Sequence, residues 1–388
     1  MSLPPPPEPC PGSPAALADD AMREIFLRVP ADDPKSLVRA AAVCTTWQSI
    51  LSDVVFTRQY RAFHGAPPML GFLHNTLQMN RRYEEYVVSD FVSTASFRTP
   101  ACHERQHWRA LDSRHGLVLF HTPSKTKRDG DFAICDLLTY DQWRIKVNDE
   151  CSDIFWHDRD NEGVLWNAAV LCGKDRCDHL YCHGGPFLVA LVFCDKGQTT
   201  TFASVYSSET HKWSDMISVE EPNAIKKSGH ITVVGDKVYF QCERSESIVE
   251  YNIGEQELSV IHLPIEDEDL PDVELMGVHD GMLLFGTIVW PRLYLRSMEA
   301  GPNGAKGWAR HRVIELRPLL PPRALFLMSV VGFAEGVGAI FLSTQDGVYT
   351  IELSSGQSKS VHSKPIFGKV MPYMSFYTRA WGRLSTSE

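Results

Sequence analysis

The spacing of hydrophobic positions changes near residue 68, and this change divides the chain into two parts. Between residues 19 and 63, apolar residues recur at intervals of three and four, the period of amphipathic helices. Beyond Pro68, short apolar or alternating runs are broken by Gly, Asp and Asn, a pattern typical of antiparallel strands joined by turns. The sequence therefore predicts an α+β multidomain protein, in which a small helical module precedes a large all-β domain.

The helical part is expected to form three or four short helices. Asp19 and Asp20 can cap the first helix, Pro30 ends it, and Pro34 suits the first turn of the second. The apolar stripes are Met22, Ile25, Phe26 and Val29; Leu37, Ala40, Ala41 and Cys44; Trp47, Ile50, Leu51 and Val54; and Phe56, Tyr60 and Phe63. About fifty residues bury too little surface for comfortable stability, so leftover apolar side chains here predict a protein partner.

The same segment resembles a known helical motif. The matching runs are Leu17-Ala18-Asp19-Asp20, Glu24-Ile25-Phe26, Ser36-Leu37-Val38-Arg39-Ala40 and Val43-Cys44-Thr45-Thr46-Trp47. In this order and spacing they resemble the F-box, which docks Skp1-type adaptors of cullin-RING ubiquitin ligases. Two positions depart from the family pattern, because Ala18 replaces a usual proline and Thr45-Thr46 a common basic pair.

The resemblance implies roles for individual residues. Residues expected to contact the adaptor or directly support that contact are Leu17, Ile25, Val29, Pro30, Leu37, Val38 and Val43. Residues expected to hold the helices together are Met22, Cys44, Trp47, Ile50 and Leu51. The alternative is that the helices only cap the following domain.

The β-rich part contains a repeated unit. A turn followed by an apolar run recurs at 116–120, 185–189, 235–240, 280–285 and 338–342, and most of these are followed by a second strand-like element, at 134–143, 203–213, 248–260 and 348–361. The period of roughly 45 to 55 residues is close to that of a four-stranded propeller blade. Stacking such sheets around an axis buries their faces without leaving open edges.

Five blades are expected between about residues 109 and 361, and a sixth is assembled from 69–98 together with 366–381, which closes the ring. A β-sandwich with Greek-key connections is the alternative. An F-box followed by a degenerate Kelch-like propeller resembles plant F-box proteins with an associated β-propeller domain. The expected organisation is a disordered Pro-rich tail (1–14), the F-box domain (15–64), a linker (65–68) and the propeller-like domain (69–385).

Composition narrows the classes of function. The net charge of -10 argues against nucleic-acid binding, which needs clustered Lys and Arg. The longest apolar run, 187–194, is far shorter than the roughly 20 residues that span a bilayer. The N-terminus lacks the pattern of a secretory signal, so the expected location is intracellular, in the cytoplasm, the nucleus or both. The ten cysteines are expected to be reduced.

No pattern typical of catalysis or of a cofactor site is found. The sequence has no phosphate-binding Gly-rich loop and no nucleophile elbow. Cys172, Cys177, His179, Cys182 and His183 are suitable zinc ligands, but their spacing differs from that of common sites, so a hairpin loop at 173–176 is preferred and no metal is predicted. The acidic run Glu266, Asp267, Glu268, Asp269, Asp272 and Glu274 is either a solvated loop or a contact for a basic partner.

The leading hypothesis is therefore a non-catalytic subunit of an Skp1-cullin-F-box ubiquitin ligase. Its F-box would bind the adaptor, and through it the cullin-RING scaffold, while its propeller would bind an unidentified target protein. Two alternatives stay open: a binding scaffold that does not serve degradation, and a propeller enzyme with a central pocket.

Overall fold

The computed structural model describes residues 19–79, 85–94, 107–122, 131–147, 164–174, 177, 179, 185–195, 200–220, 225–226, 228–243, 247–263, 273–300 and 306–376. Leu17, the predicted tail at 1–14, Cys182, His183 and the acidic residues 266–272 lie outside these ranges. None of the helices in these ranges has the length and apolar character needed to cross a membrane.

Four short helices form the first module. They are α1 (Asp19–Leu27), α2 (Pro34–Ala41), α3 (Thr45–Ser52) and α4 (Val54–His64). Their buried core contains Met22, Phe26, Leu37, Ala41, Ile50, Leu51, Phe56, Tyr60 and Phe376, with Val29, Val38 and Trp47 half-buried against it. Asp53 caps α4 by accepting a hydrogen bond from the Val55 N–H (3.0 Å), and its carboxylate also pairs with Arg23 of α1 at 2.9 Å.

The prediction that Cys44 belongs to this core is wrong. The helical period that placed Cys44 beside Leu37 is interrupted, because α2 ends at Ala41. Cys44 instead has an extended backbone at the N-cap of α3 and is exposed to solvent. Ala41 is the last α2 residue in the core.

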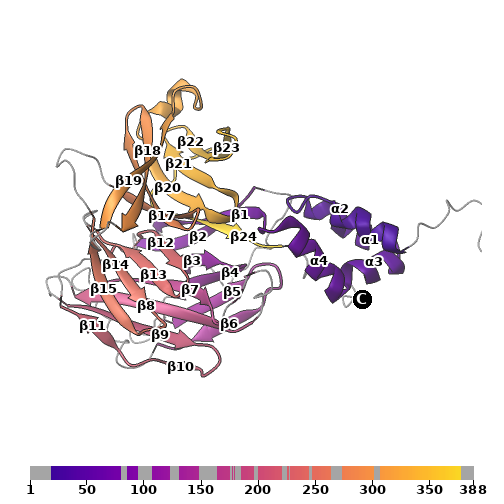
Figure 1. Ribbon diagram of the computed structural model, residues 1–388, viewed down its shortest axis with the longest axis horizontal. Coiled ribbons are helices and arrows are strands. Elements are labelled where there is room, and N and C mark those ends of the chain that lie inside the picture. The colour runs from indigo at the N-terminus through magenta and orange to yellow at the C-terminus, as the bar shows by residue number, and fades with distance from the viewer. Residues whose placement is uncertain are drawn as a thin grey trace, which may run out of the picture.

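The second module is a six-bladed propeller (Figure 1). Its first four sheets are β1 (Met69–Met79), β2 (Glu85–Ser93) and β24 (Val370–Met374); β3 (Arg109–Arg114), β4 (Leu117–Thr122), β5 (Asp131–Asp136) and β6 (Gln142–Ile145); β7 (Val164–Cys172), β8 (Phe187–Asp195), β9 (Thr201–Ser207), β10 (Lys212–Trp213) and β11 (Ile217–Val219); and β12 (Ile231–Val234), β13 (Lys237–Gln241), β14 (Ser247–Asn252) and β15 (Glu257–His262). The last two are β16 (Glu274–His279), β17 (Met282–Val289), β18 (Arg292–Ala300) and β19 (Lys306–Glu315), then β20 (Ser329–Ala334), β21 (Ala339–Thr344), β22 (Gly347–Glu352) and β23 (Ser358–His362).

The ring is closed by strands from both ends of the domain, as the sequence predicted. The closing sheet has the order β2-β1-β24, so its innermost strand comes from the C-terminal end of the domain. β24 pairs antiparallel with β1, with Leu73 opposite Met371. Figure 1 shows yellow β24 beside indigo-to-violet β1, at the junction with the helices. The six sheets and this closure exclude the β-sandwich.

The five predicted turn-and-strand segments become β4, β8, β13, β17 and β21, the second strand of each remaining blade. Two of the turns that precede these strands show why the sequence pattern predicts them. The hairpin His115-Gly116 has φ values of 52° and 76°, and Asp280-Gly281 has 50° and 76°. Two successive left-handed residues match the twist of two-residue hairpins, and glycine adopts such values at little cost.

The two modules are joined at more than one point. Helix α4 ends at His64, and β1 begins at Met69. After β24, the Ser375 N–H donates a hydrogen bond to the Pro68 carbonyl (3.2 Å), and the following residue, Phe376, enters the helical core. The chain therefore returns from the closing blade to the helices.

Candidate functional site

The helical module exposes part of the face expected to bind an adaptor. Ile25 on α1 is 49% exposed and Val43, between α2 and α3, is 63% exposed. Pro30 is also exposed, whereas Val29 and Val38 are half-buried against the core. These residues combine apolar side chains at the surface with supporting side chains just beneath it, an arrangement suited to burying a partner.

Leu37 has a different place from the others. Its side chain is only 1% exposed and lies within the helical core, so it supports the surface from beneath and does not face solvent. The core is ordered by aromatic contacts, since Phe26 meets Trp47 edge-on with ring centroids 5.4 Å apart. The Tyr60 hydroxyl donates to the Val29 carbonyl at 3.0 Å, which fixes the end of α1 against α4.

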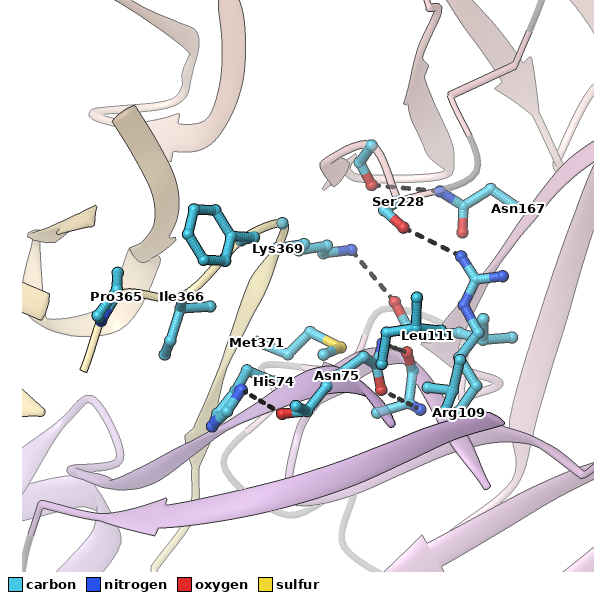
Figure 2. Close-up of a pocket in the computed structure, with 17 residues that line it drawn as sticks. His74, Asn75, Arg109, Leu111, Asn167, Ser228, Pro365, Ile366, Lys369 and Met371 are labelled. Carbon is cyan, nitrogen blue, oxygen red and sulfur yellow. Dashed lines mark hydrogen bonds between the residues drawn. The ribbon is translucent and has the colours of Figure 1, made fainter. Parts of the chain in front are cut away.

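A cavity of about 500 Å³ lies at one end of the propeller axis, where the innermost strand β3 begins (Figure 2). Asn75 on β1 accepts a hydrogen bond from the Ala110 N–H (3.0 Å) and donates one to the Ala110 carbonyl (2.8 Å), so it joins two blades. On the opposite wall, Asn167 of β7 donates to the Gly229 carbonyl at 3.2 Å. These bonds hold the walls in place.

Two basic side chains, Arg109 and Lys369, line this first cavity. Arg109 donates to the Ser228 hydroxyl at 3.1 Å, and Lys369 donates to the Leu111 carbonyl at 3.2 Å, as Figure 2 shows. Burial, together with repulsion from Arg114 and Arg109, lowers the pKa of Lys369 to about 8, although Asp112 acts in the opposite direction. Lys369 is thus mostly protonated at neutral pH. No carboxylate is found among the described residues that line this cavity.

A second cavity of about 490 Å³ lies where the innermost strands end, next to the linker residues Gly65, Ala66 and Pro67. Arg114 crosses this end of the axis. Its guanidinium meets the Asp112 carboxylate at 3.1 Å, the Glu335 carboxylate at 3.5 Å and the Ile231 carbonyl at 2.7 Å. One side chain therefore connects three blades.

The carboxylates of the second cavity are engaged in structural bonds. Asp112 also accepts from the Val170 N–H (3.2 Å), and Glu335 from the Val278 N–H (3.3 Å). Burial raises the pKa of Glu335, and the neighbouring Arg114 counteracts that effect. Burial also lowers the pKa of His230 to about 3, so this imidazole stays neutral across the physiological range. Asp112 and Glu335 therefore brace this end of the axis.

Comparison with known proteins identifies the helical module. Residues 16–59 match the F-box domain family. The N-terminal helices are an F-box domain. This match covers α1 to α3 and the first part of α4, including the exposed Ile25 and Val43.

No curated protein matches the chain. Solved structures show only weak similarity. One is a structure from a study of two prolyl endopeptidases, with 9% sequence identity and a TM-score of 0.38. The alignment covers 90% of this chain but only 53% of the endopeptidase chain, about half of that protein. A protein from Lactobacillus plantarum aligns over 78% of this chain and 99% of its own, with 11% identity and a TM-score of 0.39. A putative 6-phosphogluconolactonase from Bacteroides uniformis aligns over 78% of this chain and 98% of its own, with 12% identity and a TM-score of 0.36. Similarities this weak carry no argument about function.

Several residues around the F-box and the cavities had not been singled out from the sequence. Arg109 and Lys369 are 260 positions apart, so only the closed ring brings them to one cavity. Phe376 joins the F-box core from the far end of the chain. Of the predicted acidic run, only Glu274 is described, and it pairs with Lys226 at 2.8 Å.

Proposed function

We propose that this protein is the substrate-recognition subunit of an Skp1-cullin-F-box ubiquitin ligase. One observation carries the proposal: an F-box domain with exposed apolar Ile25 and Val43 is packed against a propeller that has a ligand-sized cavity. The F-box would bind an Skp1-type adaptor, which is attached to a cullin-RING scaffold, and the propeller would bind the target protein. The chain would then act in the cytoplasm or the nucleus, where such ligases work.

The proposed mechanism is positional. The protein would raise the effective concentration of target lysines near a conjugating enzyme held by the same scaffold, and it would do no bond chemistry itself. This mechanism benefits from a fixed relation between the two binding sites. The insertion of Phe376 into the F-box core, next to the closing strand β24, supports such a relation.

The first cavity is the proposed place for the target. Its lining combines the cations Arg109 and Lys369 with the apolar Leu77 and Phe367, the latter 88% exposed. In a chain with a net charge of -10, a concave site with two cations and no described carboxylate favours a negatively charged ligand. We therefore expect the target to present an acidic segment with a neighbouring apolar side chain.

The non-degradative scaffold is the second candidate, and it would use the same two surfaces. It differs in its outcome, since a bound target would not be ubiquitinated. The propeller enzyme is not favoured, because Asp112, Glu335 and His230 are occupied or kept neutral as described above.

Adaptor binding tests the proposal first. A purified Skp1-type adaptor would be titrated calorimetrically into the intact chain and into an Ile25→Asp, Val43→Asp variant, with circular dichroism to verify folding. Both side chains are largely exposed, so the charges are tolerated in the free protein but are buried at the proposed interface. Phe63→Asp is the matched control, because Phe63 is 58% exposed but lies outside residues 16–59.

The expected result is binding by the intact chain and by Phe63→Asp, and loss of binding by the double variant. Absence of binding by the intact chain, or equal binding by the folded double variant, would overturn the proposal.

A further inference from the structure

Three side chains of types that can bind a metal ion meet at the end of β7. Cys172 is the last residue of β7, and Cys177 and His179 belong to the connection that leads to β8. Their ligand atoms, two sulfurs and an imidazole nitrogen, all lie within 4.8 Å of one another. Neither cysteine forms a disulfide bond. The spacing of these residues in the sequence differs from that of common metal sites. The fold nevertheless brings their ligand atoms together.

The β7–β8 connection begins and ends at closely paired backbone segments next to Cys172. Cys172 lies opposite Phe187 in the sheet, and the Gly173 N–H donates to the Pro186 carbonyl at 2.8 Å. A Cβ atom on Gly173 would lie only 3.0–3.1 Å from the Pro186 backbone and the Phe187 nitrogen, so the chain approaches itself closely here. The predicted loop at 173–176 is therefore too short, because β8 begins only at Phe187.

The other two donors are held by local contacts. The His179 N–H donates to the Cys177 sulfur at 3.4 Å. His179 has a left-handed backbone, with φ of 59°. Its ring stacks on His115, at the β3–β4 turn, with centroids 4.1 Å apart and planes 20° apart. The imidazole is thus oriented from outside the loop.

We propose that Cys172, Cys177 and His179 are ligands of a zinc ion that clips the β7–β8 connection to the end of its blade. Thiolate and imidazole are the donors typical of structural zinc sites. Donors on a tetrahedral zinc ion lie about 3.5–3.8 Å apart, so atoms that lie within 4.8 Å of one another need to approach by at most about 1.3 Å. Each thiol loses its proton to solvent as the metal binds.

The sequence continues with two more residues of the right type. Cys182 and His183 follow in the same connection and lie outside the described residues. The proposed site is defined by the three described donors, Cys172, Cys177 and His179. A metal that closes a loop also limits its conformations, which stabilises the folded state.

The clip would shape the second cavity. His115 and His179 both line that cavity, next to the linker residues Gly65 to Pro67. Metal binding would therefore fix one wall of the space between the propeller axis and the F-box. This inference is independent of the ubiquitin-ligase proposal, because it concerns the propeller alone.

The test measures metal uptake by the full chain. Protein purified under reducing, metal-free conditions would be reconstituted with Zn²⁺ or Co²⁺, desalted and analysed for bound metal, and the Co²⁺ form examined for sulfur-to-metal charge transfer and tetrahedral absorption bands. The variants are Cys177→Ser and His179→Asn, both in the loop and outside the described core. Cys44→Ser is the matched control, because Cys44 is an exposed cysteine that belongs to the F-box domain and not to the cluster.

We expect one tightly bound ion per chain in the intact protein and in Cys44→Ser, with thiolate charge transfer, and loss of that ion in the two cluster variants. The proposal is overturned if the reduced intact chain takes up no ion, or if the cluster variants bind as much as the intact chain. A Cys172–Cys177 disulfide found by peptide mapping of the protein as isolated from the cell would also overturn it.

Discussion

The rings of Tyr60 and Phe376 meet edge-on, with centroids 6.3 Å apart and an interplanar angle of 77°. Tyr60 belongs to the last helix of the F-box domain, whereas Phe376 follows the strand that closes the propeller. The Arg61 guanidinium lies over the same Phe376 ring, 5.8 Å from its centroid. Because the linker at 65–68 is the covalent connection between the modules, Phe376 provides a second, non-covalent attachment.

We expect Phe376→Ala to destabilise the F-box domain by about 3 kcal/mol, because it empties a buried site in a small core and removes the contact with Tyr60. Urea unfolding followed by circular dichroism would measure the loss, and limited proteolysis at 65–68 would report loosening of the modules. Phe367→Ala is the matched control, since Phe367 is exposed. Equal stability of the two variants would show that Phe376 does not anchor the F-box.

Arg114 is expected to be the most sensitive side chain of the propeller axis. Arg114→Met removes the guanidinium that pairs with the charge of the buried Asp112 carboxylate, which costs about 3–5 kcal/mol. Adding Asp112→Asn removes that charge and should recover part of the loss, as a double-mutant cycle in urea would measure. A cost for the single variant within the error of the measurement would contradict the bracing role.

His230 predicts a pH dependence of stability. Its pKa in the folded protein, about 3, lies below the ordinary value of 6.5, so the unfolded chain takes up the proton first. The contribution of neutral His230 to the free energy of unfolding is fully present above pH 6.5. It is lost as the pH falls from 6.5 towards 3, and the free energy of unfolding then changes by at most about 1.4 kcal/mol per pH unit. Urea unfolding at pH 7, 6 and 5 would show this slope.

His230→Asn should flatten this dependence and remove about 2 kcal/mol of the loss between pH 6.5 and 5. His262→Asn, on an exposed residue of β15, is the control and should leave the slope unchanged. An unaltered slope in His230→Asn would mean that burial does not keep this imidazole neutral.

Lys369 predicts how the first cavity selects a ligand. A randomised, fluorescent peptide library should yield mainly acidic binders, and their affinity should fall as the pH rises through about 8, where Lys369 loses its charge. Lys369→Met should lower the affinity for these peptides at pH 7 and remove the fall in affinity at higher pH. Lys212→Met, on an exposed lysine of β10, should change neither the affinity nor its pH dependence. Selection of neutral or basic peptides would contradict the charge assignment.

Local patterns predicted most of the fold. The turns at Gly116 and Gly281 require backbone conformations that few residues adopt easily, so they mark hairpins in the sequence. The F-box residues follow one another closely, and their helical spacing is visible without the tertiary fold. The resemblance to plant proteins and to Kelch repeats stays a prediction.

Contacts between distant residues could not be predicted in this way. Leu37 and Val38 are adjacent in the sequence, yet only packing decides that Leu37 is buried and Val38 is half-buried. Cys44 was misplaced because a helix end cannot be located to the residue from spacing alone. Phe376 reaches the F-box only because β24 pairs with β1.

Ubiquitin transfer to proteins held by the propeller tests the proposed function most directly. Intact protein and the Ile25→Asp, Val43→Asp variant would each be loaded with binding partners from cell extract and supplied with adaptor, cullin-RING scaffold, conjugating enzyme and ubiquitin. We predict that both forms retain the same partners, and that these are ubiquitinated only on the intact protein. Partners that stay unmodified on the intact protein, or are modified equally on both, would contradict a role in substrate recognition.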